Sequence, residues 1–286
     1  MIHPRVLFRM PMAKMKTGVG SSDRGNDEIR EIEVKMDFTP NALSSLLYSQ
    51  GDTQVLVCVT RAPSLPRWFP RDSDRGWVHA EYSLLPGSTD TRFRRERSGA
   101  KGRTMEIERL IARSLRGAVD LEELGPVALT VDCDILNADG GTRCASITAA
   151  NIALRLAVRR LISSGECIPK DRRLTREQIR KGAKQETLSK EEMTSHEASV
   201  MPNDVAALSV GMVDGEIRTD LDYVLDSNAD VDMNVVMISS GEFVEVQGTG
   251  EEATYSRSEL DSLIDAAQSG IAKLHKLQSE ILSDAS

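Results

Sequence analysis

The sequence predicts an α+β protein in which helices pack on one side of a mixed β-sheet. Its first half contains short segments in which apolar and polar residues alternate, as they do in half-buried strands. A helical pattern, a further strand and a long apolar helical pattern follow, in that order, between residues 104 and 161. Runs of strands followed by helices are typical of α+β proteins, whereas a parallel α/β sheet alternates the two throughout.

The composition is that of an ordinary soluble globular protein. Of the 286 residues, 40% are hydrophobic and 28% are charged, which excludes a disordered chain and allows a sizeable core. The longest apolar runs, such as residues 55–59, are far shorter than the roughly 20 residues of a membrane-spanning helix, so we expect no membrane partner. The four cysteines form no CxxC pair, which predicts reduced thiols in a cytoplasmic protein and neither a disulfide framework nor a zinc site.

The first 22 residues are basic and contain no acidic residue. Arg9, Pro11 and Lys14 interrupt the apolar core that a secretory signal would need. Two interpretations stay open: translation begins at a later methionine, or residues 1–27 form a disordered basic arm. In either case we expect residues 28–286 to form a single domain.

The first strands are predicted at residues 29–36, 43–49, 53–60 and 76–85. The turn at residues 50–52 suits a hairpin, and the continuous apolar run at 55–59 predicts a central strand that is buried on both faces. Residues 104–121 follow as an amphipathic helix, whose apolar face carries Ile107, Leu110, Ile111, Leu115 and Ala118.

The second half opens with a charged insertion at about residues 168–200. It contains few apolar residues, so that it is either a charged helical segment or a mobile surface loop, and the charge density favours the loop. The Asp214-Gly215 pair predicts a hairpin between strands at 205–212 and 216–223. A second hairpin joins residues 233–238 to 242–247, and a final helix begins at Ser256, which fits a capping box with Glu259.

The stretch from residue 137 to residue 146 (NADGGTRCAS) joins an alternating strand at 127–135 to a helix that starts near Thr142. A helix start leaves backbone N–H groups unpaired and carries partial positive charge. Two glycines allow an anion to approach these groups, and Arg143 adds a full charge. Arg103 begins a helix of its own and meets the same anion if the two helix starts converge. The other interpretation is an ordinary tight turn in which Thr142 is the N-cap and Arg143 is a surface residue.

Charges are segregated along the chain, although the net charge is −8. Residues 92–116 contain nine basic and three acidic residues, which suits a polyanion. Residues 220–232 contain five aspartates and no Lys or Arg, which suits a divalent cation. Within that segment Asp226 and Asp232 flank a turn and can hold Mg²⁺ together with water, the alternative being that they cap turns.

Three long motifs carry a resemblance to a known family: residues 76–86 (GWVHAEYSLLP), 102–111 (GRTMEIERLI) and 132–143 (DCDILNADGGTR). With shorter matches at 220–223, 232–236 and 245–249, the chain resembles the ribonuclease PH family from about residue 51 to its end, apart from the charged insertion. The resemblance implies a β-α-β-α fold, in which mixed sheets have helices packed between and against them. It also implies a phosphate-dependent 3′-to-5′ exoribonuclease that trims tRNA precursors and other RNAs, including ribosomal RNA, and releases nucleoside diphosphates.

The resemblance also assigns residues to roles. The phosphate-binding positions of the family fall on Arg103, Gly141, Thr142 and Arg143. Its acidic pair falls on Asp226 and Asp232, which are expected to be catalytic and to hold Mg²⁺ or Mn²⁺. In the family's RNA-binding loop Arg92 and Arg95 match, whereas Gly87 and Asp90 replace a basic residue and a histidine. Two outcomes stay open: RNA binding is weaker, or its contacts are redistributed onto Arg94 and Arg97. Residues 23–26 and 44–46 depart from the family pattern, so N-terminal contacts are not predicted.

Family members form dimers that join into a ring, so the resemblance implies a homohexamer built as a trimer of dimers. Two other functions stay open. The chain could be an RNA-binding ring subunit of an exosome-like assembly with little catalysis of its own, although such a subunit would need neither the phosphate turn nor the acidic pair. It could also be a metal-dependent RNA hydrolase, which would release monophosphates without phosphate.

Overall fold

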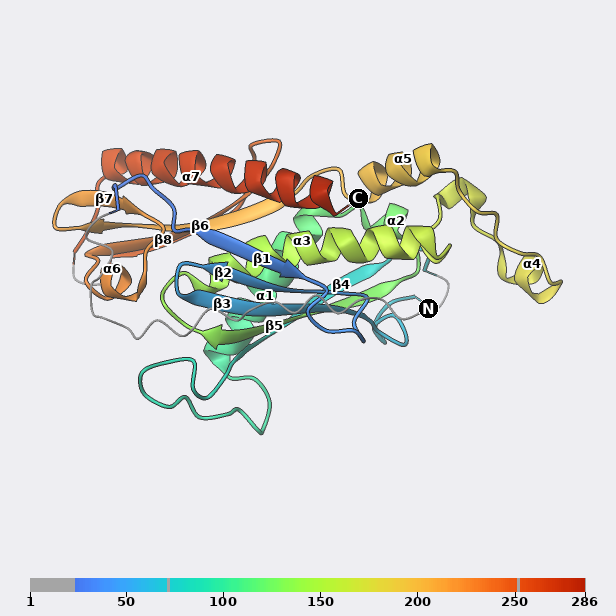
Figure 1. Ribbon diagram of the computed structural model, residues 1–286, viewed down its shortest axis with the longest axis horizontal. Helices are drawn as coiled ribbons and strands as arrows, with labels where there is room; N and C mark the ends of the chain where they lie inside the picture. The colour runs from blue at the N-terminus through green and yellow to red at the C-terminus, as the bar shows by residue number, and fades with distance from the viewer. Residues whose placement is uncertain (1–23, 71–72, 251–252, 286) are drawn as a thin grey trace, which may run out of the picture.

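The computed structural model describes residues 24–70, 73–250 and 253–285, and it contains two β-sheets with helices between them (Figure 1). In the first sheet the strand order is β1-β2-β3-β5-β4. Its strands are β1 (Ile32–Met36), β2 (Ser44–Gln50), β3 (Thr53–Arg61), β4 (Trp77–Leu84) and β5 (Ala128–Asn137). β4 and β5 run parallel, whereas β1, β2, β3 and β5 pair antiparallel in turn. The four predicted strands of the first half are therefore confirmed, with small shifts at their ends.

The second sheet has the order β7-β6-β8-β9 and is antiparallel throughout. Its strands are β6 (Val205–Val213), β7 (Glu216–Thr219), β8 (Val231–Ile238) and β9 (Phe243–Gly250). Both predicted hairpins are confirmed, and Asp214 and Gly215 have the positive φ angles, 52° and 76°, that a tight hairpin turn requires. β7 is shorter than predicted because Asp220, at a φ of 59°, turns the chain out of the strand.

The helices form two layers. α1 (Gly102–Ala118) and α3 (Thr142–Ser163) lie between the two sheets, and α7 (Arg257–Asp284) covers the outer face of the second sheet (Figure 1). The predicted mixed sheet with helices on one side is confirmed for the first half of the chain, where α1 and α3 pack on one face of the first sheet. The strands of the second half form a separate antiparallel sheet, which packs against α3 and α7. The β-α-β-α layering that the family resemblance implies is the observed one. None of the helices in the described ranges is both long and apolar enough to cross a membrane.

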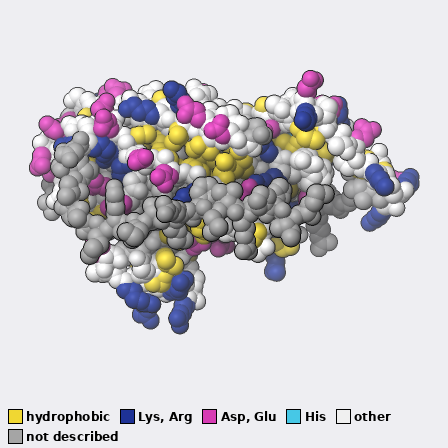
Figure 2. Space-filling model, in the orientation of Figure 1, with side chains coloured by type: hydrophobic (Ala, Val, Ile, Leu, Met, Phe, Trp, Pro, Cys, Tyr) yellow, Lys and Arg dark blue, Asp and Glu magenta, His cyan; other side chains and the backbone are white. Residues whose placement is uncertain are grey.

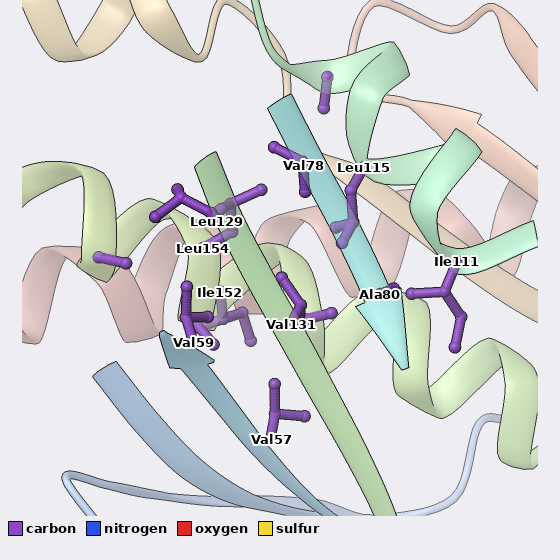
Figure 3. Close-up of a cluster of buried hydrophobic side chains, with 14 of the residues drawn as sticks. Val57, Val59, Val78, Ala80, Ile111, Leu115, Leu129, Val131, Ile152 and Leu154 are labelled. Carbon is purple, nitrogen blue, oxygen red and sulfur yellow. The ribbon is translucent and has the colours of Figure 1, made fainter. Parts of the chain in front are cut away.

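The main core lies between the first sheet and the helices α1 and α3. Figure 3 shows Val57 and Val59 of β3, Leu129 and Val131 of β5 and Val78 and Ala80 of β4 facing Ile111, Leu115, Ile152 and Leu154 of the two helices. The expectation that β3 is buried on both faces is wrong: Leu56 and Cys58 on its other face are only partly buried, because α3 packs against the valine side alone. A second core lies between the second sheet and α7.

The charged insertion is helical in part, whereas its charge density favours a loop throughout. A short α2 (Leu121–Leu124) precedes it, and the insertion itself forms a 3-10 turn at Lys170–Arg172, α4 (Arg176–Arg180) and α5 (Lys190–Val200). Glu197 of α5 accepts hydrogen bonds from Arg155 and Arg159 of α3, and His196 and Val200 are buried. Part of the charge is therefore paired within the protein. Charge density alone favours a loop because it does not show this pairing.

A buried ion pair joins the two sheets. Arg30 precedes β1 and is 8% exposed, and Asp220 follows β7 and is 1% exposed. The Nη2 and Nε atoms of Arg30 donate to the two carboxylate oxygens of Asp220 at 2.7 and 3.0 Å, and the backbone N–H of Arg30 donates at 2.7 Å. The sequence predicts a strand from Ile29, but β1 starts at Ile32, because this contact draws the preceding backbone away from the sheet. Burial alone would raise the pKa of Asp220, but the attraction and hydrogen bonds of Arg30 outweigh it and lower that pKa.

The same arginine supports the glycine turn between β5 and α3. Its Nη1 donates to the backbone oxygen of Asp139 at 2.5 Å, and Thr53 donates to the oxygen of Gly140 at 2.7 Å. Gly140 has a φ of 71°, and a Cβ atom there would lie 2.4 Å from the carbonyl carbon of Asp222, so only glycine fits. The turn is thereby held against the start of β3 on one side and against the second sheet on the other.

We expect Asp220→Asn to lower the free energy of unfolding by about 3 kcal/mol or more at pH 7, because Arg30 is left as a buried charge without its partner. The folded-state pKa of Asp220 is lowered, so its stabilisation is complete above the ordinary carboxyl pKa of about 3.9 and is lost as the pH falls through the folded value. The deficit of the variant should therefore shrink in acid. Urea unfolding of both proteins from pH 7 to pH 3 measures it.

Asp37→Asn is the matched control. Asp37 pairs with Arg160 at 2.6 Å, but both side chains are exposed, and asparagine tolerates the φ of 53° at this position. An exposed pair contributes less than about 1 kcal/mol. A loss of stability in this control equal to that of Asp220→Asn would contradict the importance assigned to the buried pair.

Candidate active site

The topology of the first sheet brings two helix starts to one place. β4 and β5 are parallel, so their carboxyl ends lie at the same edge of the sheet. α1 follows β4 through the loop at residues 85–101, and α3 follows β5 through the glycine turn. Arg103 and Arg143, each in the first turn of its helix, line one cavity of about 540 Å³. A shared anion site for the two arginines requires that the two helix starts converge, and in the structure both arginines line this one cavity.

Most of the predicted site residues line this cavity. They are Arg92, Arg94, Arg103, Gly141, Thr142, Arg143, Asp226 and Asp232, together with Asp90 of the preceding loop. Arg95 and Arg97 are not among the lining residues. Leu84, Phe93, Ser209, Tyr223 and Asn234 also line the cavity, and the sequence did not single them out.

The start of α3 has the geometry of an anion site. Gly141 is the N-cap residue with a φ of 62°, and no side chain caps the first turn. Thr142 is thus the first helical residue and not the N-cap of the ordinary-turn interpretation. Its hydroxyl is 2.9 Å from that of Tyr82, which is 3% exposed. Burial raises the pKa of Tyr82, while Thr142, Arg103 and Arg143 act to lower it, so both arginines lie close to this pair of hydroxyl groups.

Four aspartates line the cavity, namely Asp90, Asp139, Asp226 and Asp232, and the two that form the predicted acidic pair come from different elements. Asp226 lies in α6 (Tyr223–Ser227), and Asp232 is the second residue of β8. Asp222 does not join them, because its carboxylate caps α6 by accepting from the N–H of Leu225 at 2.9 Å. The five-aspartate segment is therefore divided: Asp220 pairs with Arg30, Asp222 caps a helix, Asp226 and Asp232 line the cavity, and Asp230 is exposed outside the cavity lining.

Asp226 and Asp232 suit a hard cation. Within the described ranges no three or more His, Cys, Asp or Glu side chains gather as a metal site. An ion bound here would therefore have two carboxylate ligands and complete its shell with water or substrate oxygens. Mg²⁺ is commonly held in this way, so the donor set fits it.

The loop between β4 and α1 stands away from the body of the protein, at the bottom of Figure 1, and Figure 2 shows Lys and Arg side chains at its tip. The basic residues of this loop include Arg92, Arg94, Arg95 and Arg97. Phe93 anchors it: its N–H donates to the oxygen of Pro86 at 2.9 Å, and its ring packs against the main core. The anchor holds the flanking Arg92 and Arg94 at the cavity. Burial raises the pKa of Asp134 in β5, and the positive charge of Arg95 acts against that rise.

Sequence reasoning missed the residues that support the site. Arg30 and Thr53 hold the glycine turn, and Tyr82 contacts Thr142, yet none of the three was singled out. Tyr82 lies inside a recognised motif, so its signal was available. Arg30 lies in the N-terminal part for which no contacts were predicted, and its partner Asp220 is 190 residues away.

Comparison with known proteins agrees with this architecture. Residues 28–159 match the model of domain 1 of the 3′ exoribonuclease family, and residues 204–270 match that of domain 2. A protein named Ribonuclease PH from Rhodopirellula baltica is 45% identical over 258 residues, which are 90% of this chain and 95% of the relative. Another of that name, from Corynebacterium kroppenstedtii, is 43% identical over 271 residues, 94% of this chain and 95% of the relative.

Among solved structures, Rrp46 from rice superimposes with a TM-score of 0.65 at 15% identity, over 91% of this chain and 98% of the other. The Archaeoglobus fulgidus exosome with RNA bound to the active site gives 0.65 at 22% identity, over 90% and 91% of the two chains. At these identities the likeness concerns the fold. The family models and the two close relatives carry the assignment further: the chain belongs to the ribonuclease PH family of phosphorolytic 3′-to-5′ exoribonucleases.

Proposed function

We propose that this protein shortens tRNA precursors, and other RNAs such as ribosomal RNA, from their 3′ ends, with inorganic phosphate as co-substrate. The observation that carries the proposal is that one cavity is lined by the two helix-start arginines, the predicted pair of carboxylates and two loop arginines. Both family-matched regions contribute residues to it, so we infer that residues 28–286 act as one functional unit, with residues 168–200 as an insertion.

The proposed reaction is an in-line displacement at phosphorus. Arg103, Arg143 and the N–H groups of the first turn of α3 would hold inorganic phosphate, which is a dianion near neutral pH. An oxygen of this phosphate attacks the last phosphodiester of the RNA, and the bond to the 3′-oxygen of the preceding nucleotide breaks. The products are a nucleoside diphosphate and an RNA shortened by one nucleotide, whose 3′-oxygen takes up a proton.

The protein's own contribution is positioning and electrostatic stabilisation, and no protein nucleophile is required. Asp226 and Asp232 would hold Mg²⁺ or Mn²⁺, which when bound offsets negative charge on the phosphoryl oxygens and on the leaving 3′-oxygen. A phosphodiester is exchanged for a diphosphate of similar energy, so the reaction should run in reverse when nucleoside diphosphate is abundant.

The loop arginines are proposed to guide the RNA. Arg92 and Arg94 line the cavity and would contact the phosphates of the terminal nucleotides, whereas Arg95 and Arg97 of the same loop lie outside the cavity lining. Contacts of this kind are sequence-independent and weaken with salt. They suit an enzyme that degrades many 3′ ends.

The alternative of a ring subunit with little catalysis is not favoured. Its support is the likeness to exosome subunits, which lies below 25% identity and concerns the fold. The relatives at 43–45% identity bear the name Ribonuclease PH, and Arg103, Arg143, the glycine turn and the acidic pair all line the one cavity.

The products distinguish phosphorolysis from hydrolysis. Incubated with a tRNA that carries a 3′ extension, the protein should release nucleoside diphosphates in proportion to added phosphate, and almost nothing without it. Thin-layer chromatography of the released nucleotides gives the answer. Monophosphates formed in phosphate-free buffer would instead identify a metal-dependent hydrolase.

We expect Arg143→Ala and Asp232→Ala each to lower the rate of phosphorolysis by at least about a hundredfold, the usual cost of removing one group that stabilises transition-state charge. The thermal unfolding midpoint should stay close to that of the wild type, because both side chains line the cavity. Arg61→Ala, which removes an exposed ion pair with Glu166, is the control and should retain full activity. Full phosphate-dependent activity in either site variant would refute the assignment of that residue.

We propose that the active form is a homohexamer assembled as a trimer of dimers. A ring can gather the basic loops of several copies toward the RNA while acidic surfaces face outward, which reconciles RNA binding with a net charge of −8. Sedimentation velocity at the protein concentration of the activity assay should show a species of about six chain masses. A monomer with full activity would contradict the ring.

A further inference from the structure

The guanidinium group of Arg143 is held by side chains from two other elements. Its Nη1 donates to the side-chain oxygen of Gln247 in β9 at 2.8 Å. Gln247 in turn donates through its amide nitrogen to a carboxylate oxygen of Glu106 in α1 at 3.2 Å, and the same oxygen is 3.8 Å from Arg143. The three groups form a closed triangle beside the cavity. Neither Glu106 nor Gln247 lines the cavity itself.

The direction of these contacts is set by chemistry. An ionised carboxylate can only accept hydrogen bonds, so Glu106 fixes which end of the Gln247 amide points toward it. The amide oxygen must then face Arg143. Among the residues that the structure describes, these contacts involve only Nη1 of the guanidinium group, so its other N–H groups can hold an anion in the cavity.

From this geometry we propose that Glu106 and Gln247 are positioning residues that aim Arg143 at the attacking phosphate. The inference rests on the proposed function, since it assumes that Arg143 binds phosphate. Glu106 is also three residues after Arg103 on the same helix, so both helix-start arginines have the carboxylate nearby. The two residues act on phosphate and not on RNA, because their contacts end at Arg143.

The test separates the two substrates. Gln247→Leu should raise the KM for phosphate about tenfold, the scale of one hydrogen bond to a charged group, while the KM for RNA stays within about twofold. Gln247→Glu should also raise the KM for phosphate, because it places two carboxylates side by side. Exchange of the two groups in Glu106→Gln with Gln247→Glu restores one acid and one amide, and should return the KM for phosphate toward the wild-type value.

Glu245→Gln is the matched control. Glu245 lies two residues before Gln247 and pairs with Arg113, so it ties β9 to α1 without touching Arg143. The control should leave the KM for phosphate unchanged. If it raises that KM as much as Gln247→Leu does, loosening of β9 from α1 explains the effect and the positioning role is refuted.

A second measurement does not depend on turnover. Inorganic phosphate should raise the thermal unfolding midpoint of the wild type. At the same phosphate concentration the midpoint of Gln247→Leu should rise less, and the midpoint of the exchanged double variant should rise nearly as much as that of the wild type. An unchanged phosphate KM and an unchanged phosphate-induced shift in Gln247→Leu would overturn the positioning role alone. A wild type that releases no diphosphate and gains no stability from phosphate would instead overturn the proposed function.

Discussion

The buried pair of Arg30 and Asp220 is the interaction on which the rest of the structure depends. Two charges leave water only where hydrogen bonds replace the lost solvation, and here the guanidinium group and the backbone N–H of Arg30 both bond the carboxylate. The same guanidinium group reaches the oxygen of Asp139. One side chain thereby fixes the second sheet, the start of β1 and the glycine turn relative to one another. The position of the start of α3 depends on this contact, because α3 directly follows the glycine turn.

The site built on this support places opposite charges a short distance apart. Arg103 and Arg143 would repel each other in an apolar pocket, but Asp226 and Asp232 share their cavity and Glu106 lies beside Arg143. The cavity therefore offers a place for an anion and a place for a cation within one volume, which is what transfer of a phosphoryl group requires. The net negative charge of the whole chain does not oppose this, because fields at a cleft are set by nearby groups.

The sequence predicts those features that depend on nearby residues. The alternation of Val131, Cys133 and Ile135 specifies a strand with one buried face, and the Asp214-Gly215 pair specifies a tight hairpin turn. The start of α3 at Thr142 follows from its two glycines. The contact of Arg30 with Asp220 spans 190 residues and leaves no periodic pattern, so no local rule finds it. For the same reason the sequence does not predict the helical parts of the insertion, since the ionic partners of Glu197 lie on α3, far from it in the sequence.

The parallel pairing of β4 with β5 has a consequence for how this enzyme can change. Both helix starts are fixed by the sheet, whereas the loop at residues 85–101 only has to leave β4 and return to α1 at the same edge. Its length and composition can therefore vary while Arg103 and Arg143 keep their places. With the roles proposed above, phosphate binding and RNA selection would reside in separately replaceable parts of the chain, and a change in the loop, at Gly87 or Asp90 for example, would alter RNA binding and leave the two helix starts in place.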